Sequence, residues 1–586
     1  MLVLGLNTTH DGSVALLRDG EIVCAVEEER LSRNKHHYGF PHLALQNVLE
    51  REGITFSDLD AVGFYWDPYH GLVRFLGHFL RHLPRSLSYV TSAGQQGIFL
   101  DFARLPSRLR RDRGFRGRFR FCRHHEAHCA SAFLLSDRDE AAVLSVDGTG
   151  EWTTTLLAHG RGADLRVLRT IGYPHSLGKV YEALTQYLGF KVNSGEGKVM
   201  GLSSYGKPTF RHVFDRILRP RPDGGFRVDK SYFAYHLGKP LKYSSRLVSE
   251  LGPVRVPESE LDQRHADIAR SLQDCVGDAV LRLCHALHRE TGSASLCLAG
   301  GVGHNSVING RILRETPFEH LFVQPAAHDS GAALGAALLT HAALVRGEGG
   351  QPRRPRPLRD AFLGPSYGPD EERRALEASG LSFRHTEDPG HEAALLLARG
   401  EVVGWFQGRM EYGPRALGHR SILADPRTSE MKDLVNRRIK FREPFRPFAF
   451  SVLLERVRDY FDCEVPSPFM LLVYPVRNEA KDLIPAVVHT DGTCRLHTVS
   501  RDDDPLFHRV LSEFEELTGV AGVLNTSFNR RGEPMVCSPE DAIRTFEGSG
   551  LDALFLGSWI VRRRDGAGKG GRDAAATDRA TGGRAP

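Results

Sequence analysis

Two histidines four residues apart could form half of a metal site. His124 and His128 lie in RHHEAHCASA, a segment of small residues typical of a packed helix. Side chains at this spacing share one helix face, where two neutral imidazoles can bind one divalent metal. The spacing is weak on its own, because about one such pair is expected by chance among 27 histidines in 586 residues. A second pair, His78 and His82, lies among leucine and phenylalanine, where we expect an ordinary helix.

Two aspartates could complete that site. Asp147 follows the apolar run AAVLSV, and Asp329 opens the small-residue helix HDSGAALGAAL. Asp329 could instead be an N-cap, which would stabilise its helix by about 1 kcal/mol. Two histidines and two aspartates would suit Fe²⁺ or another first-row divalent ion such as Mn²⁺ or Zn²⁺.

A histidine also interrupts the first predicted hairpin. Residues 2–6 and 13–17 have the apolar pattern of two strands, and the loop between them contains His10 and Asp11. An imidazole with an unperturbed pKa near 6.5 can act as a general base. Taken alone, this loop is more typical of a polar turn, and the rest of the chain must supply a partner for His10.

The strand–loop–strand unit occurs twice. Residues 141–146 and 152–158 repeat the pattern about 135 residues further on, with Asp147, Gly148 and Thr149 in the loop. The repeat predicts a duplicated α/β lobe, and glycine-rich loops facing each other can hold phosphate oxygens, as in actin-like ATPases. A third strand–glycine unit follows at 295–305.

Composition limits the class of protein. A chain of 586 residues with 41% apolar and 25% charged residues should form two to four globular domains. The net charge of +5 is small for this length, and the nine cysteines form no CxxC pair, which favours a reducing compartment. No apolar run approaches the length of a membrane span. We therefore expect a cytoplasmic protein with no membrane partner.

The chain divides at a segment rich in glycine, proline and arginine. We expect an N-terminal domain at 1–345, with lobes at about 1–140 and 141–345, and a linker at 346–359 with little to bury. A second α/β domain should occupy 360–562, with strands near 402–406, 448–453, 470–475 and 553–561. The low-complexity tail, 563–586, is predicted to be disordered.

Basic residues of the second domain alternate with aromatic residues. Lys440, Arg442 and Arg446 lie in IKFREPFRPF, where phenylalanine and proline predict pocket walls rather than a solvated surface. Arginine offers a planar fork of donors that matches phosphate, and lysine adds a compact charge. The segments GRMEYGPRALGHR, DGTCR and LNTSFN add further cations, amides and hydroxyls.

The order of these motifs resembles one family. HDGSVALL, HHEAHCASAF, GEGKVMGLSSYG, LAGGVGHN and HDSGAALGAAL occur here in the order found in the O-carbamoyltransferases that modify nodulation factors, cephamycins and the aminoglycoside nebramycin. The resemblance covers nearly the whole chain. It implies a duplicated actin-like (ASKHA, threonylcarbamoyl-transferase-like) N-terminal domain and an α/β YrdC-like C-terminal domain.

The resemblance also implies roles for residues. The metal set would be His124, His128, Asp147 and Asp329, with His10, Asp11 and Lys35 in the transfer cavity. The residues implied to bind nucleotide in the first domain are Gly148, Thr149, Gly197, Lys198, Gly201, Gly300, Gly301, Val302 and Asn305. Those implied to bind carbamoyl phosphate and ATP in the second are Arg415, Lys440, Arg442, Arg446, Arg495, Asn525 and Ser527.

The implied reaction has two steps. The second domain would make carbamoyl adenylate from carbamoyl phosphate and ATP, with Mg²⁺ accompanying ATP. The first would transfer the carbamoyl group to a hydroxyl of a secondary metabolite. The arginine- and glycine-rich composition favours an antibiotic sugar as this acceptor. Members of the family are commonly homodimers.

Two other enzymes remain open. Residues 104–123 contain nine arginines interleaved with phenylalanines, which could bind RNA and would suit a tRNA threonylcarbamoyl-type enzyme. The nearly balanced total charge disfavours a nucleic-acid partner. A small-molecule kinase of actin-like fold would need neither the second domain nor the histidine pair.

Overall fold

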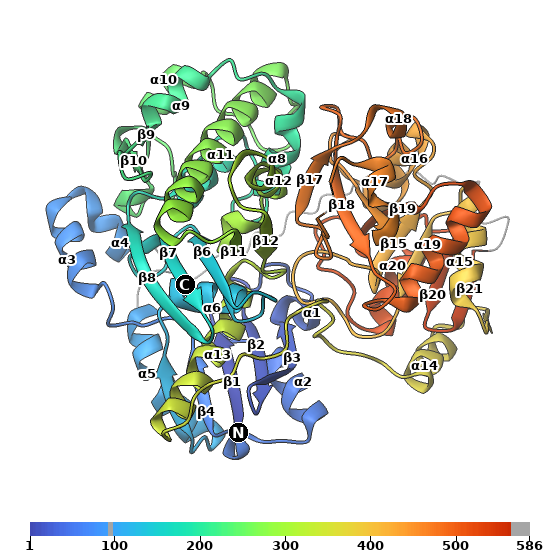
Figure 1. The fold of residues 1–586 in the computed structure, drawn as a ribbon, viewed down its shortest axis with the longest axis horizontal. Helices are drawn as coiled ribbons and strands as arrows, with labels where there is room; N and C mark the ends of the chain where they lie inside the picture. The colour runs from blue at the N-terminus through green and yellow to red at the C-terminus, as the bar shows by residue number, and fades with distance from the viewer. Residues whose placement is uncertain (92–97, 464, 564–586) are drawn as a thin grey trace, which may run out of the picture.

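The computed structural model describes residues 1–91, 98–463 and 465–563. Two α/β bodies lie side by side, the first coloured blue to green-yellow and the second yellow to red (Figure 1). The predicted disordered tail lies outside the described residues apart from Arg563. None of the described helices is long and apolar enough to cross a membrane.

The first body contains two five-stranded sheets with one topology. In the first sheet, β1 to β3 form an antiparallel meander, and β4 and β5 run parallel to β1, in the order β3-β2-β1-β4-β5. In the second sheet, β6 to β8 form the meander and β11 and β12 the parallel pair, in the order β12-β11-β6-β7-β8. The predicted strand–loop–strand repeat is confirmed. The strands are β1 (Leu2–Asn7), β2 (Ser13–Arg18), β3 (Glu21–Glu27), β4 (Ala61–Phe64), β5 (Arg118–Phe121), β6 (Glu140–Val146), β7 (Thr153–Arg161), β8 (Asp164–Gly172), β11 (Ser295–Ala299) and β12 (His320–Val323).

Two helices of this body lie between the sheets: α13 packs against β1, β2 and β4 of the first sheet, α6 packs against β6, β7 and β11 of the second, and the two helices pack against each other. Glycine allows this close approach. A Cβ on Gly335 of α13 would lie 1.8 Å from the Ala127 carbonyl oxygen of α6, and one on Gly5 of β1 would lie 1.9 Å from the Ala333 oxygen of α13. The helices are α1 (Glu28–Ser32), α2 (His42–Glu52), α3 (Leu72–Arg81), α4 (Ser88–Thr91), α5 (Ile98–Arg113), α6 (His124–Phe133), α7 (Leu177–Tyr187), α8 (Glu196–Leu202), α9 (Arg211–Ile217), α10 (Ser245–Leu251), α11 (Gln263–Thr291), α12 (Ser306–Glu315) and α13 (Asp329–Gly347), with a small hairpin of β9 (Leu218–Pro220) and β10 (Phe226–Val228).

The second body is built on a mixed nine-stranded sheet, β13-β21-β20-β14-β15-β19-β16-β18-β17. The strand predicted at 553–561 is two antiparallel strands, because Gly557 turns the chain with φ +57°. The strands are β13 (Phe383–His385), β14 (Val403–Phe406), β15 (Arg420–Ala424), β16 (Ala449–Leu453), β17 (Leu472–Pro475), β18 (Thr493–Val499), β19 (Gly522–Ser527), β20 (Ala553–Leu556) and β21 (Trp559–Arg562). The helices are α14 (Pro369–Ser379), α15 (Pro389–Ala398), α16 (Ser429–Leu434), α17 (Val457–Tyr460), α18 (Asn478–Lys481), α19 (Pro505–Thr518) and α20 (Pro539–Glu547).

The segment between the bodies contacts the first body. Helix α13 continues to Gly347, and no helix or strand follows before α14. Arg354 donates to the Phe133 carbonyl oxygen at 2.8 Å, and the Leu358 amide donates to the Leu135 oxygen at 2.8 Å. Most side chains of this segment are exposed, and Arg354 and Leu358 attach it to the end of α6.

Candidate functional site

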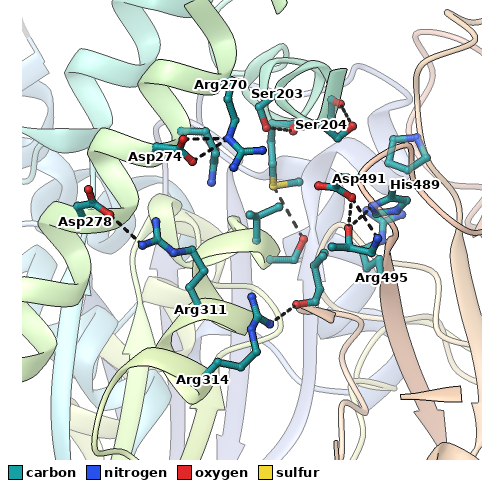
Figure 2. Close-up of a pocket in the computed structure, with 18 of the residues that line it drawn as sticks. Ser203, Ser204, Arg270, Asp274, Asp278, Arg311, Arg314, His489, Asp491 and Arg495 are labelled. Carbon is teal, nitrogen blue, oxygen red and sulfur yellow. Dashed lines mark hydrogen bonds and ion pairs between the residues drawn. The ribbon is translucent and has the colours of Figure 1, made fainter. Parts of the chain in front are cut away.

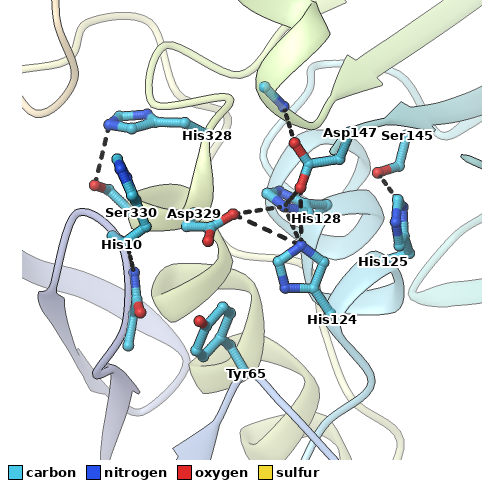
Figure 3. A network of polar contacts seen from close by, with 12 residues as sticks. His10, Tyr65, His124, His125, His128, Ser145, Asp147, His328, Asp329 and Ser330 are labelled. Atoms are coloured by element: carbon cyan, nitrogen blue, oxygen red, sulfur yellow. Dashed lines mark hydrogen bonds and ion pairs between the residues drawn. The ribbon is translucent and has the colours of Figure 1, made fainter. Parts of the chain in front are cut away.

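Four side chains converge between the sheets of the first body (Figure 3). The Nε2 atoms of His124 and His128 lie 3.0 Å apart. Asp147 Oδ2 lies 3.1 Å from His124 Nε2, and Asp329 Oδ1 lies 3.6 Å from both Nε2 atoms. The four ligand atoms all lie within 4.8 Å of one another.

Each ligand is positioned by the end of an element. The histidines occupy the first two turns of α6, Asp147 follows β6, and Asp329 is the first residue of α13. Asp329 makes no capping hydrogen bond, because His328 is the N-cap residue. Of the two roles considered for Asp329, the structure therefore favours the cluster.

The charge balance of the cluster fits a cation. Burial opposes charge on His128, yet hydrogen bonds to Asp147 and Asp329 raise its pKa to about 9. Burial likewise opposes charge on Asp147, and the two imidazoles hold its pKa well below the usual value. Two half-buried carboxylates beside buried imidazoles need positive charge, which a divalent ion would supply. The donors present therefore fit a metal, although they do not identify which one.

Neighbouring histidines have other partners. Both ring nitrogens of His125 are bonded, Nδ1 to Ser145 Oγ at 2.8 Å and Nε2 to the Thr153 oxygen at 2.9 Å. In the second HxxxH pair, His78 Nε2 bonds the His236 oxygen and His82 Nδ1 bonds the His78 oxygen. The helix predicted for this pair is confirmed as α3, with His82 as its C-cap residue.

His10 belongs to a second cluster beside the first. Asp11 Oδ2 lies 2.8 Å from His10 Nδ1, and Asp11 Oδ1 lies 2.9 Å from His36 Nδ1. Burial opposes charge on His10, but the hydrogen bond to Asp11 and the charge of Asp329 raise its pKa. The Asp11 carboxylate thus holds His10 in one orientation through Nδ1.

Lys35 lies toward the second body. Burial lowers its pKa, Glu29 partly offsets this, and Arg446 lowers it further. The charges acting on Lys35 come from Glu29 and Arg30 of α1, Lys198 of α8 and Arg446 of the second body.

The predicted nucleotide loops surround the metal-type cluster. The Gly301 amide donates to Asp147 Oδ1 at 2.9 Å. Gly300 has φ +86°, and a Cβ there would lie 2.3 Å from the Val146 oxygen. Gly148 and Thr149 follow Asp147 in the β6–β7 loop, with Lys179 beside Gly148.

The remaining nucleotide candidates belong to α12, to the turn before it and to α8. Asn305 caps α12 and bonds Gln273 at 2.9 Å, with Val302 in the turn before it. Gly197, Lys198 and Gly201 lie in α8. Lys198 Nζ reaches Glu443 Oε1 of the second body at 2.7 Å.

A cavity of about 630 Å³ opens between the two bodies (Figure 2). Its first wall includes Met200 and Gly201 of α8 and Arg311 of α12; its second includes His489 and Arg495. Predicted binding residues of both bodies thus border one cavity, which has the size of a small-ligand site.

Five cations gather in the second body. Burial and the neighbouring charges lower the pKa of Lys440, Arg442 and Arg415 well below their usual values, and lower that of Arg495 to about 10. The positive charge of Arg446 lowers the pKa of all four groups. Like charges held together in a buried place favour an anionic ligand.

The polar candidates here are partly occupied by protein. Lys440 Nζ donates to the Ser527 oxygen at 2.7 Å and to Asn529 Oδ1 at 2.6 Å. The Asn525 amide donates to Ala416 and Ser451, while its buried Oδ1 has no partner among the described residues. Phe441 is exposed, so the pocket-wall interpretation is wrong for that ring.

Sequence reasoning overlooked two groups. The Glu151 carboxylate accepts from the His124 and Asp67 amides at 2.9 Å, which fixes the start of α6. His328 Nε2 lies 3.3 Å from Glu27 Oε1, beside the His10 cluster. The only signal in the sequence was their position: Glu151 ends the motif DGTGE that begins with Asp147, and His328 directly precedes Asp329 in HDSG.

Comparisons with known proteins point to one family. A family model described as Carbamoyltransferase N-terminus matches residues 2–338, and one described as Carbamoyltransferase C-terminus matches 394–563. The chain is 39% identical to nodulation protein NolNO of Sinorhizobium fredii, over 95% of this chain and 79% of that one. It is 40% identical to nodulation protein NolO of Bradyrhizobium diazoefficiens, over 75% and 79%. An uncharacterised Synechocystis protein is 41% identical over 96% of both chains.

The similarity to solved structures is weak. Full-length HypF in the phosphate- and nucleotide-bound form aligns with a TM-score of 0.30 and 13% identity, over 60% of this chain and 56% of that one.

Proposed function

This chain belongs to the carbamoyltransferase family and is a carbamoyltransferase enzyme, and we propose that it works through carbamoyl adenylate. In this proposal the second body, a YrdC-like domain, makes the adenylate from carbamoyl phosphate and ATP. The first, an actin-like domain, transfers the carbamoyl group to a hydroxyl. The observation that carries the proposal is the cavity bordered by Gly201 of α8 and Arg495 of the second body.

The cation group suits adenylate formation. Water first releases phosphate from carbamoyl phosphate to leave carbamate. A carbamate oxygen then attacks the α-phosphorus of ATP, and pyrophosphate leaves. Lys440, Arg446 and Arg495 would hold these anions and stabilise charge on the departing phosphate groups. A cavity between two domains also limits the access of water to the adenylate.

The His10 cluster suits the second step. An acceptor hydroxyl attacks the carbamoyl carbon, AMP leaves, and His10 Nε2 takes the hydroxyl proton. Asp11 holds the imidazole and stabilises its protonated form. The Gly301 amide and the loop with Gly148 and Thr149 would bind the nucleotide phosphates.

His124, His128, Asp147 and Asp329 would hold a divalent metal, for which we propose Fe²⁺. When bound, the metal supplies Lewis-acid stabilisation of negative charge on phosphate or carbamoyl oxygen. For the acceptor we propose a hydroxyl of an antibiotic sugar, on the basis of composition.

The test measures pyrophosphate release from ATP by the purified, metal-loaded chain without any acceptor. Release should require carbamoyl phosphate and should be abolished by Lys440→Ala and Arg495→Ala. His10→Ala should leave it intact. Arg437→Ala is the matched control, since this exposed arginine lies on the same turn as Lys440 and pairs with Asp433. Hydroxylated antibiotics are then screened for the mass gain of one carbamoyl group.

Pyrophosphate release at the same rate with and without carbamoyl phosphate would overturn the adenylate step. ADP formation dependent on a small acceptor would indicate the kinase alternative. A carbamoyl-type modification of tRNA would indicate the tRNA enzyme.

A further inference from the structure

The insertion between β4 and β5 combines exposed apolar and basic side chains. Eight of the sixteen large apolar side chains that are exposed in the described part of the chain lie within residues 69–100. Residues 67–123 hold twelve arginines against three aspartates, a net charge of +9. The whole chain carries +5, so the remainder is slightly acidic.

Helix α3 is attached to the protein by one face only. Its inner face carries His78, which bonds the His236 oxygen at 2.7 Å, and Phe75, whose ring contacts Tyr89. The outer face carries Leu72, Val73, Leu76 and Leu80, exposed by 46%, 84%, 54% and 56%. No residue of α3 is buried. The side that faces water is therefore aliphatic, the reverse of an ordinary surface helix.

The basic residues adjoin this helix. All nine arginines between 104 and 123 are exposed, and Arg104 and Arg108 are one turn apart on α5. Strand β5 lies at the edge of its sheet with Arg118 and Arg120 exposed. Its last residue, Phe121, contacts Tyr69, just before α3, with ring centroids 5.9 Å apart. Helices α3 and α5 lie along the same side of the first body (Figure 1).

We propose that this surface, α3 with the arginines of α5 and β5, docks on an anionic phospholipid bilayer. An interfacial helix buries its apolar face at the level of the headgroups, while flanking arginines bind lipid phosphates. The mode is peripheral and needs no spanning helix. It departs from the expectation that the protein has no membrane partner, which rested on spanning segments alone.

Other occupants match the surface less well. RNA would pair with the arginines but would leave the aliphatic side chains of α3 uncovered. A symmetric dimer through this surface would bring two strongly positive patches face to face, at a cost in repulsion. Charge complementarity therefore favours an anionic, partly apolar partner.

The test is flotation of the full chain with vesicles of phosphatidylcholine, with and without phosphatidylglycerol. Binding should require phosphatidylglycerol and should weaken with salt. The double variant Val73→Glu, Leu76→Glu should lose binding at least tenfold. Arg104→Gln and Arg108→Gln should each weaken it roughly fivefold. The controls are Leu517→Glu and Arg373→Gln, exposed residues of the second body, which should bind like the original chain.

All variants should keep the thermal midpoint and the carbamoyl-phosphate-dependent pyrophosphate release of the original chain, so failure of either proposal can be recognised separately. Three results would overturn the docking surface. The first is equal binding to both vesicle types. The second is binding to single-stranded RNA but not to vesicles, with the RNA binding kept in the Val73→Glu, Leu76→Glu variant. The third is a concentration-dependent dimer that forms without vesicle binding and is lost in the same variant.

Discussion

The two histidine–aspartate clusters differ in how their polar atoms are used. In one, the Nε2 atoms of His124 and His128 converge on two carboxylates, while their Nδ1 atoms are buried without a partner among the described residues. In the other, Asp11 bonds the Nδ1 atoms of two histidines, one of which is His10. The first arrangement suits a metal, and the second would orient His10 as the proposed base.

Asp11→Asn should impair transfer without affecting adenylate formation. An amide supports the charged form of His10 less well, so the pKa of His10 should fall. The acidic limb of the transfer pH profile should then move to lower pH, and the maximal rate should drop by about 10²-fold or more. Measuring transfer and pyrophosphate release across pH checks this. An unchanged pH profile would remove Asp11 from this role.

Asp147→Asn should lower the metal content of the purified chain well below one ion per molecule, because one anionic ligand of four is lost. Metal analysis after dialysis gives the readout. His78→Ala, in the HxxxH pair whose nitrogens bond carbonyls, should leave the metal content unchanged. An equal loss of metal in Asp147→Asn and His78→Ala would contradict the assignment of Asp147 to the metal site.

At the scale of elements, the close packing of α13 against α6 and β1 brings Asp329 to the histidines. Gly335 and Gly5 permit that packing, since a side chain at either position would overlap a backbone oxygen. The geometry of the cluster therefore depends on residues that bear no ligand atoms.

Gly335→Ala should push α13 away from Ala127 of α6. We expect a loss of stability of about 1–3 kcal/mol together with weaker metal binding. Gly347→Ala is the matched control on the same helix, because its added methyl group would meet only the end of Arg118 at 4.0 Å. Thermal unfolding and metal titration of both variants test the prediction, which fails if Gly335→Ala binds metal normally.

Glu372 of α14 should make stability depend on pH. Burial against the turn at Gly557 raises its pKa from 4.5 to about 7. The folded chain then binds more protons than the unfolded chain between about pH 4.5 and 7, so this contribution to stability falls as pH rises through that window. Glu372→Gln should stabilise the protein by about 1 kcal/mol at pH 8 and little at pH 5. Denaturant unfolding at both pH values tests the prediction. An equal gain in unfolding free energy at pH 5 and pH 8 would contradict the raised pKa of Glu372.

Over the whole molecule, contacts from α1 and its C-terminal end hold the two bodies around their shared cavity. Arg30 donates to the Gly413 oxygen at 2.7 Å, and Arg33 to the Met535 and Pro534 oxygens at 2.5 and 3.0 Å. If an unstable adenylate passes between the bodies, these contacts should protect it from water.

Arg33→Ala should therefore uncouple the two steps. Pyrophosphate release should continue, while the carbamoylated product formed per pyrophosphate should fall several-fold. Arg531→Ala is the control. It removes another arginine that pairs across the two bodies, but its ion pair with Glu258 is exposed and should contribute little to holding them together. A normal product ratio in Arg33→Ala would argue against a protected transfer.

Local patterns in the sequence determined most strands, the helices carrying both HxxxH pairs and the duplicated sheet, because apolar periodicity is set by neighbours along the chain. The ordered motifs also identified the family. Sequence could not decide whether Asp329 was a cap or part of a cluster, nor that His36 shares Asp11 with His10. The first outcome depends on α13 packing against α6, and the second on a contact between residues 25 apart in the chain. The split at Gly557 was missed because one turn glycine interrupts an otherwise continuous apolar run. The cavity and the shared burial of five cations likewise exist only in the packed molecule, since burial and cross-domain distance have no local signal.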